Sequence, residues 1–187
     1  MNRSLAAIAL VVAVLVVGCS SQSPEPSPAP APDRFGAPVP PRSLDGTAHA
    51  ARPCSLLDSS ELRQFGLEAN GRVQQLPYGS PACVWSGPGF SREVSVAVVV
   101  DRDYLVDTYR SRPTYQVFEP ITIDGLPAVA QQTTPTALTC TVTTGIALGQ
   151  AVDVSSTEFG SQPSPPCETA RRVTEVVVSS LPPVPTK

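Results

Sequence analysis

The chain has 187 residues, with 13 lysines and arginines against 16 aspartates and glutamates, which gives a formal net charge of −3 at pH 7. Nucleic-acid-binding domains present a basic surface patch, so this mild acidity excludes them and we expect no nucleic-acid partner. Nor does the charge favour electrostatic binding to an anionic membrane surface. The length fits one domain with additional terminal segments.

A short apolar run occupies Leu5 to Val17 and follows a single positive charge at Arg3. It is too short for a transmembrane helix, which needs roughly 20 apolar residues, and is typical of a secretory signal peptide. The run ends in Val16-Val17-Gly18-Cys19, which resembles a bacterial lipobox. We therefore expect residues 1–18 to be a lipoprotein signal peptide and Cys19 to carry palmitate and the other acyl chains of the anchor. The protein would then sit on the extracytoplasmic face of the bacterial cell membrane. An ordinary signal peptide with a coincidental cysteine is the alternative.

Residues 19–53 are predicted to form a tether between the lipid anchor and the folded domain. Proline occupies every second position from Pro24 to Pro32, mostly with serine and alanine between. Such a segment buries too little apolar surface to fold and is predicted to be disordered. As polyproline II, at ~3.1 Å per residue, it would reach up to roughly 100 Å. A proline-rich recognition motif is the alternative.

Four cysteines remain once Cys19 is assigned to lipid: Cys54, Cys83, Cys140 and Cys167. An even number in an exported chain indicates two disulfides, for which three pairings are possible. Their long spacings, without a C-x-x-C motif or a neighbouring histidine, argue against a zinc site. We expect no metal and no cofactor.

The folded domain is predicted over residues 54–181, followed by a tail at 182–187. Asp58 and Glu61 have capping-box spacing, and the short helix that follows should end at Gly66. Weak strands are predicted at 73–76 and 83–86. Alternating valines predict a strand at 92–100, after which Asp101 is expected to cap a helix that ends before Pro113.

The second half of the domain is predicted to be rich in strands. A strand over 115–123 meets the hairpin turn Asp124-Gly125 and returns over 128–132. Strands over 138–144 and 146–155 are expected to turn at Gly145. Pro165-Pro166 opens a last helix, which ends before Pro182. This order of elements predicts an α+β fold, with a mostly antiparallel sheet covered by helices on one face.

Five short segments of the sequence, taken in their order and spacing, indicate a family. They are Pro53-Cys54, Cys83-Val84-Trp85, Ile123-Asp124-Gly125, Cys140, and Pro166-Cys167-Glu168-Thr169-Ala170. Together they resemble a family of small actinobacterial lipoproteins of unknown function, which includes the mycobacterial LprB and LprC type. The resemblance covers the mature domain and the lipobox. It implies an envelope lipoprotein with two disulfides and supplies no catalytic residue.

For the pairing we expect Cys54–Cys83 and Cys140–Cys167. Each pair brackets one half of the domain and joins the start of a helix to a strand. Closing a loop of about 30 residues should stabilise each half by roughly 3.5 kcal/mol.

Few residues offer catalytic chemistry. His49, in the predicted tether, is the only histidine, and Lys187 is the only lysine. A histidine-dependent triad, a multi-histidine metal site and a Schiff-base lysine in the fold are therefore excluded. Two carboxylate pairs could act as in glycosidases, and these are Asp101 with Asp103 and Asp153 with Glu158. Capping and solvation are the favoured interpretation of all four residues.

The aromatic residues have two interpretations. Trp85, two residues after Cys83, is expected to pack in the core, with a ligand-stacking surface as the alternative. Five further aromatics could line a cleft for an apolar envelope molecule, although a domain with 5% aromatic residues needs such side chains for its core. These five are Phe90, Tyr104, Tyr109, Tyr115 and Phe118.

Three functional classes follow. The favoured one is a non-catalytic interaction or accessory module of the cell envelope, which predicts an exposed apolar patch for an envelope protein partner. The alternative is a small-ligand, lipid or glycan-binding lipoprotein, which predicts a deep apolar cavity. A cell-wall hydrolase that uses a carboxylate pair is least favoured and predicts perturbed pKa values in a cleft.

Overall fold

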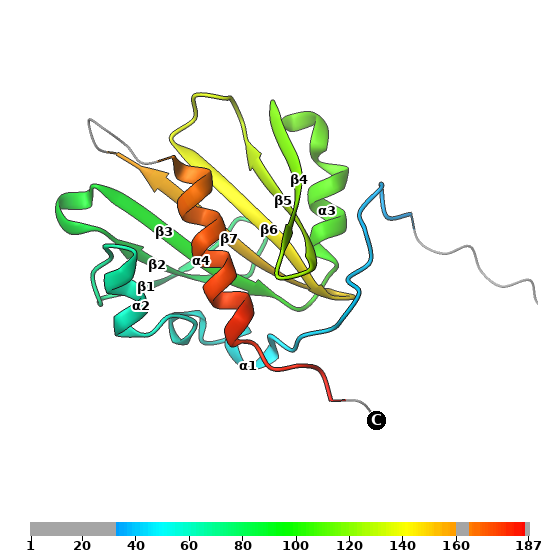
Figure 1. Cartoon of the computed structure of the whole chain (residues 1–187), viewed down its shortest axis with the longest axis horizontal. Helices are drawn as coiled ribbons and strands as arrows, with labels where there is room; N and C mark the ends of the chain where they lie inside the picture. The colour runs from blue at the N-terminus through cyan, green and yellow to red at the C-terminus, as the bar shows by residue number, and fades with distance from the viewer. Residues whose placement is uncertain (1–32, 160–164, 186–187) are drawn as a thin grey trace, which may run out of the picture. The chain divides into compact units, whose positions relative to one another are not determined.

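The computed structural model describes residues 33–159 and 165–185; the predicted signal peptide and lipidation site Cys19 lie outside them. Seven strands form one sheet in the order β1-β2-β3-β7-β6-β5-β4, and every neighbouring pair is antiparallel (Figure 1). The strands are β1 Arg72–Gln75, β2 Pro81–Ser86, β3 Arg92–Val99, β4 Val117–Ile123, β5 Leu126–Gln132, β6 Thr139–Ala147 and β7 Gln150–Glu158. The helices are α1 Thr47–Ala50, α2 Ser59–Gln64, α3 Tyr104–Arg110 and α4 Pro166–Ser180. The predicted α+β class and antiparallel sheet are confirmed.

The larger core lies between the sheet and α4, on what we call the α4 face. Because side chains alternate along a strand, Val96, Val142 and Val154 all point to this face. Ala170, Val173 and Val177 of α4 pack against them at helical spacing, fully buried. This burial, at roughly 25 cal/mol per Å² of apolar surface, supplies most of the force that holds α4 on the sheet.

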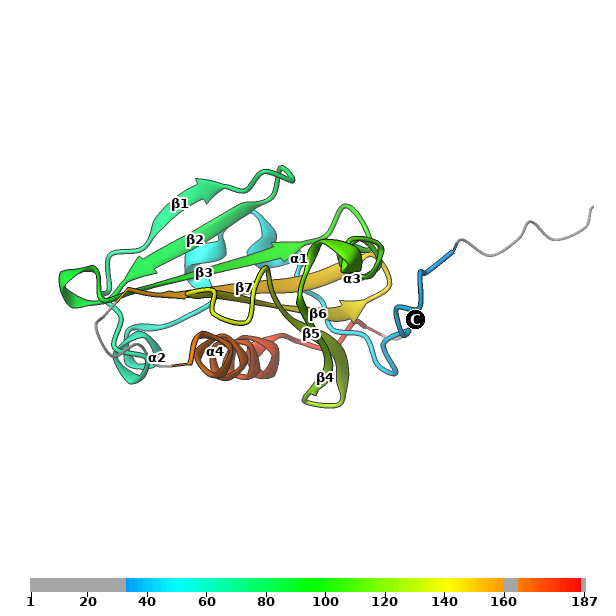
Figure 2. The same ribbon diagram turned by 90° about the horizontal axis from the view of Figure 1, so that it is seen from above.

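Helix α3 packs on the opposite face, which we call the α3 face. Figure 2 shows α3 and α4 on opposite sides of the sheet. Leu105 and Val106 of α3 form a second, smaller core with Ala37 and Val129. Helices therefore contact both faces of the sheet, although the larger core is on one of them.

Two local predictions are confirmed. The Asp58 carboxylate accepts hydrogen bonds from the backbone N–H of Ser60 at 2.7 Å and of Glu61 at 2.9 Å, and the Asp58 N–H donates to the Glu61 carboxylate, which completes the capping box. Asp124 and Gly125, at φ 48° and 75°, form the two-residue turn between β4 and β5. Both φ values are those of the turn that fits the twist of paired strands.

Two other turn and cap predictions are wrong. Strand β6 continues through Gly145 with an irregularity between residues 145 and 147, and the chain turns instead at Leu148-Gly149. A Cβ at Gly145 would lie 2.9 Å from Leu105 Cδ2, so this glycine is required by the close approach of α3. The cap of α3 is Asp103, whose carboxylate accepts from the Val106 N–H, and not Asp101.

Both predicted disulfides are present. Cys54 pairs with Cys83 across 29 residues, and Cys140 pairs with Cys167 across 27 residues. The first ties the segment before α2 to strand β2, and the second ties α4 to strand β6. Each bond therefore fixes a helical segment on the α4 face.

The structure begins the domain earlier than residue 54. We call residues 33–46 the N-terminal strap. Ala37 lies in the small core on the α3 face, and Leu44 lies in the large core on the α4 face. The strap therefore crosses from one face of the sheet to the other around its end. The Leu44 N–H donates to the Ile146 carbonyl at 2.8 Å. The predicted disordered tether therefore does not extend to residue 53. The prediction from composition is wrong here, because the proline-rich segment also contains a few apolar residues that are buried in the two cores.

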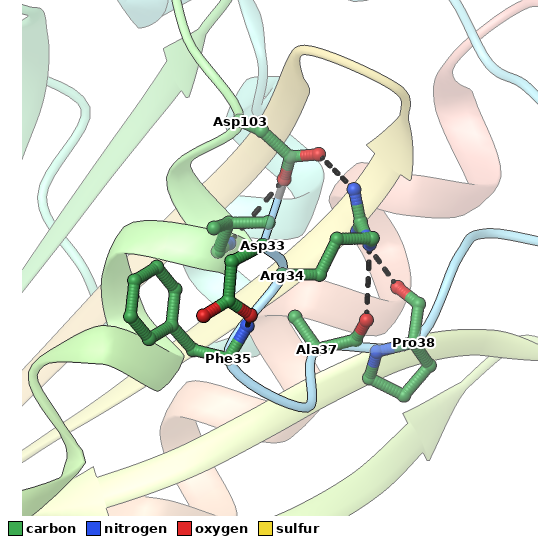
Figure 3. A network of polar contacts seen from close by, with 7 residues as sticks. Asp33, Arg34, Phe35, Ala37, Pro38 and Asp103 are labelled. Atoms are coloured by element: carbon green, nitrogen blue, oxygen red, sulfur yellow. Dashed lines mark hydrogen bonds and ion pairs between the residues drawn. The ribbon is translucent and has the colours of Figure 1, made fainter. Parts of the chain in front are cut away.

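Polar contacts fasten the start of the strap (Figure 3). The Arg34 guanidinium forms an ion pair with Asp103 and donates to the carbonyls of Ala37 and Pro38, each at 3.0 Å. Arg42 pairs with Asp124 at the tip of the β4–β5 hairpin. His49, expected in a solvated linker, lies in α1 with its Nδ1 2.9 Å from the Ser55 hydroxyl.

The strap also pairs with the residues that were predicted as a tail. Leu44 and Pro183 form an antiparallel bridge, and the Val184 N–H donates to the Ser43 carbonyl at 3.0 Å. Residues 182–184 are thus part of the fold.

The sheet has two edge strands, β1 and β4. Pro120 lies in the middle of β4 opposite Val129, and because proline has no N–H it leaves a gap in the donors of this edge. Among the described residues, no helix has the length and apolar character to span a bilayer.

Candidate interaction surface

Three large apolar side chains are exposed at one end of the sheet. They are Phe90, 74% exposed, Phe159, 56% exposed, and Leu138, 51% exposed. The Phe159 N–H donates to the Ser91 carbonyl at 2.9 Å, and the Glu158 N–H donates to the Leu138 carbonyl at 3.0 Å. The three residues therefore lie at the ends of three adjacent strands, where β3 and β6 begin and β7 ends. We call this region the apolar end.

Phe90 is held outward by a tight loop between β2 and β3. Its φ is +55°, a left-handed conformation that costs a bulky residue about 1–3 kcal/mol. The Phe90 N–H donates to the Gly87 carbonyl at 3.0 Å, and the Gly87 N–H donates to the Arg92 carbonyl at 2.9 Å. A Cβ at Gly87 would lie 2.9 Å from Arg92 Cγ, so only glycine fits there without a shift. The loop fixes the backbone of Phe90 and leaves its phenyl ring exposed.

A shallow groove of about 370 Å³ adjoins Leu138. It lies between the segment before β6 and the start of α4, and Pro135, Ala137, Pro165 and Pro166 are among its lining residues. These side chains extend the apolar surface from Leu138 toward α4.

Two acidic side chains lie at the rim of the apolar end, and one of them, Glu168, also lines a groove with Arg171 and Arg172. The Glu68 N–H donates to the Ser86 carbonyl at the end of β2, and Glu168 lies in the first turn of α4. Both side chains are exposed, and neither forms an ion pair with a described residue. The nearby Arg92 is committed to Glu158 at 3.2 Å and to the Phe65 carbonyl.

The aromatic cleft, which was the alternative to core packing, does not form. Tyr109 packs edge-on against Phe118 with ring centroids 5.2 Å apart, and Tyr104 packs on Tyr78 at 4.4 Å. Phe90 lies at the far end of the sheet. Tyr109 alone of the five lines a surface groove of about 450 Å³, together with residues of the strap and the β4–β5 hairpin. The aromatic side chains therefore lie in different parts of the fold and do not line one cleft.

Trp85 belongs to the core. It is 1% exposed and lies in the large cluster beside Cys83. A Cβ at Gly71 would lie 2.5 Å from Trp85 Nε1 and 2.6 Å from Cys83 Sγ. This closeness shows why β1 is preceded by glycine, and confirms the core interpretation.

The pair Asp153 and Glu158 does not come together. Asp153 lies on the α3 face, where Thr143 donates to it at 2.7 Å. Glu158 points to the α4 face, where the Thr169 hydroxyl donates to it at 3.1 Å. Two carboxylates on opposite faces of a sheet cannot act on one substrate.

The other pair is engaged in separate structural roles. Asp103 caps α3 and binds Arg34. Asp101 is exposed, and its hydrogen bonds from Arg102 lower its pKa.

Asp153 is a buried acid on the α3 face. Its second oxygen accepts from the Tyr78 hydroxyl at 2.8 Å, and no described lysine or arginine pairs with it. Burial raises the pKa of Asp153, and the two hydrogen bonds oppose that rise. Burial, followed by the charge of Asp153, also raises the pKa of Tyr78 and Tyr104. The group is a polar network of one buried carboxylate and two half-buried tyrosines.

No cluster of three metal-ligating side chains occurs in the described part of the chain. Sequence reasoning missed Leu138 and Phe159, because an apolar residue at the end of a strand is normally counted with the core. For Phe90 the core was the favoured interpretation and a cleft the alternative, whereas its side chain is 74% exposed. Its place in Gly87-Pro88-Gly89-Phe90 was the available signal, since this is turn chemistry that can expose a side chain.

Comparison with known protein families gives a match over most of the chain. A family model described as a protein of unknown function, DUF3558, matches residues 14–180. Neither a curated protein nor a solved structure matches the chain.

Proposed function

This chain belongs to the DUF3558 family, and we propose that it is a lipid-anchored, non-catalytic interaction module of the bacterial cell envelope. Cys19 would be the acylated first residue, as in the small actinobacterial lipoproteins that the chain resembles. The domain would then stand on the extracytoplasmic face of the membrane and bind another envelope component.

One observation carries the interaction role: the exposed apolar surface at the ends of β3, β6 and β7. Large apolar side chains in water favour a partner that removes them from it. By contrast, Val142, Val154 and Val173 between the sheet and α4 are fully buried, and the groove of about 430 Å³ between α4 and the β4–β5 hairpin is lined mostly by charged residues. Exposed apolar side chains at one end of the sheet, without a deep apolar cavity among these observations, are the arrangement expected of an interaction protein.

Two features support the extracytoplasmic location. The leader before Cys19 has the pattern of an exported lipoprotein. The two disulfides are of a kind that persists in oxidising compartments and is rare in the cytosol.

The test of the anchor uses the full-length protein expressed in a bacterial host with lipoprotein processing. We expect the mature chain to begin at Cys19 with two or three acyl chains and to partition into the detergent phase, since two or more chains anchor stably. The variant Cys19→Ser should remain unlipidated. An unmodified N-terminus downstream of Cys19 would overturn the anchor.

A glycan-binding role is the second candidate. It is favoured by the part of the α3 face, on β6 and β7, that helix α3 does not cover. Hydroxyl groups line neighbouring strands there, with Thr141 2.6 Å from Ser155 and Thr139 2.9 Å from Thr157. Binding of cell-wall fragments that is lost in Thr141→Val, but retained in a Phe90→Ser variant, would support this role over the first. Turnover of cell-wall glycans, esters or peptides that disappears in Asp153→Asn would replace both with an enzyme.

A further inference from the structure

We propose that the apolar end docks a partner protein whose surface offers an apolar pocket with a basic rim. The phenyl ring of Phe90 would be the side chain that enters the pocket. This proposal rests on the proposed lipid anchor for its direction, and adds the site and the partner's chemistry.

The direction follows from where the chain enters the fold. The strap crosses the end of the sheet where β3 and β6 finish, as shown by the Leu44–Ile146 hydrogen bond and the Arg34–Asp103 ion pair. The apolar end is where these two strands begin. Eight residues of β3 separate the two ends, which corresponds to about 25 Å at ~3.3 Å per residue. The described chain therefore enters the fold at the end of the sheet opposite to the apolar end.

Once the proposed signal peptide is removed, the segments outside the described residues are not suited to cover this surface. Residues 20–32 contain only serine, glutamine, proline, glutamate and alanine, and residues 160–164 contain glycine, serine, glutamine and proline. Neither segment supplies a large apolar side chain, which is what an interface requires at its centre.

The charge of the rim distinguishes three remaining occupants of the apolar end: a lipid surface, a second copy of the chain, and a different protein. Glu68 and Glu168 are exposed at the rim, and Glu93 is nearby in its pair with Arg72 at 3.0 Å. An anionic lipid surface would repel these carboxylates. A second copy of the chain docked end to end would bring two acidic rims together. A protein with basic residues around an apolar pocket satisfies both the apolar centre and the rim.

Phe90 fits the role of the central anchor. Aromatic residues dominate binding energy when they enter a desolvated pocket, and rigid side chains lose less freedom on binding. The left-handed φ of Phe90 and its backbone hydrogen bond to Gly87 fix the main chain that carries the exposed ring.

Site-specific photo-crosslinking in the native envelope tests the proposal with the full lipidated chain. A photoreactive phenylalanine analogue replaces Phe90 in one strain and Leu148 in another. Leu148 is a matched control, because it is 66% exposed and lies at the opposite end of the sheet. We expect an adduct with one protein from position 90 and none of that adduct from position 148.

The chemistry of the adduct is tested with second-site variants. The yield from position 90 should fall at least tenfold with Leu138→Ser plus Phe159→Ser, and severalfold with Glu68→Lys plus Glu168→Lys. Leu148→Ser and Asp101→Lys, at exposed sites near the opposite end of the sheet, should leave it unchanged. Binding of the purified partner should weaken as salt rises, since screening reduces rim charge interactions.

Several outcomes would overturn the proposal: no adduct at position 90, an adduct with lipid or with a second copy, or an adduct insensitive to the rim charges. Binding of the protein to phosphatidylglycerol vesicles through Phe90 would do the same. Mass spectrometry of the N-terminal peptide, from the same cells, separates the two claims. A lipidated Cys19 without the adduct rejects the docking site alone, whereas the adduct on a chain without lipid rejects the anchor alone.

Discussion

Arg34 and Asp103 join the start of the described chain to the start of helix α3. Nη1 of Arg34 lies 2.6 Å from one oxygen of Asp103, and the other oxygen of Asp103 accepts the Val106 N–H at 3.3 Å. A single carboxylate therefore caps α3 and holds the N-terminal strap. Strap docking and the beginning of α3 are coupled through this residue.

Replacing Arg34 tests the coupling. Arg34→Ala removes the ion pair and two hydrogen bonds to carbonyls, and should lower the free energy of unfolding by about 1–2 kcal/mol, since both partners are partly exposed. Asp103→Asn keeps a capping side chain and should cost less. Urea unfolding measures both variants, and limited proteolysis near residue 38 reports release of the strap. An unchanged midpoint in Arg34→Ala would show that the strap is held by its apolar contacts alone.

The buried Asp153 predicts a pH dependence of stability. Its pKa is raised in the folded state, so between about pH 4 and that higher pKa the unfolded chain binds fewer protons than the folded one. Stability should therefore fall as pH rises through this range and then level off. In Asp153→Asn this contribution to the slope should be absent. Urea midpoints between pH 4 and pH 8 would show it, and parallel curves for the two proteins would contradict the prediction.

Tyr78→Phe tests the hydrogen bond to the same carboxylate. Loss of the hydroxyl leaves one buried oxygen of Asp153 without its donor at 2.8 Å. The expected cost is about 1–3 kcal/mol at neutral pH. Tyr115→Phe, which removes a hydroxyl from a nearby tyrosine, is the control. Thermal melts of the two variants should differ clearly, and equal melts would indicate that water replaces the lost donor.

Each disulfide should contribute strongly to stability. The loops of 29 and 27 residues correspond to about 3.5 kcal/mol each in the chain-entropy model. Replacing both members of either pair with serine should therefore remove a large part of the roughly 5–15 kcal/mol that is typical of a domain. Denaturant unfolding of the two double variants measures this. A loss below about 1 kcal/mol would mean that α4 or the segment before α2 is held by packing alone.

Gly46→Ala tests whether the strap is integral to the core. A Cβ at this position would lie 2.5 Å from Val98 Cγ1 and 3.1 Å from Ile146 Cδ1. Overpacking of this kind costs about 1–3 kcal/mol. Ala48→Ser adds one atom at a nearby exposed position and should change the melting temperature little. If both variants melt alike, the strap does not pack against β3 and β6 as described.

Local chemistry made part of the fold predictable. The capping box of Asp58 and Glu61 and the turn at Asp124-Gly125 depend on residues only one to three positions apart, and both form as expected. The disulfide pairing also follows from chain order, because each half of the sheet is a run of antiparallel neighbours. In these cases the information lies within the segment concerned.

The errors arise where a distant element decides the structure. Gly145 is a plausible turn residue until Leu105 of α3 occupies the space beside it. The strap has the composition of a tether. Ala37 and Leu44 are nevertheless buried in two cores, which are formed by residues far from the strap in the sequence. The apolar end was missed for the same reason, since exposure at a strand end depends on which elements stop short of it.

Pro120 has a consequence for a protein that would be concentrated in the plane of a membrane. Confinement to two dimensions raises the frequency with which neighbouring copies meet, and an open sheet edge is then a template for continuous strand pairing. A proline in the middle of β4 lacks the N–H that such pairing needs at that position. We expect crowded copies to remain separate instead of growing into fibres through this edge.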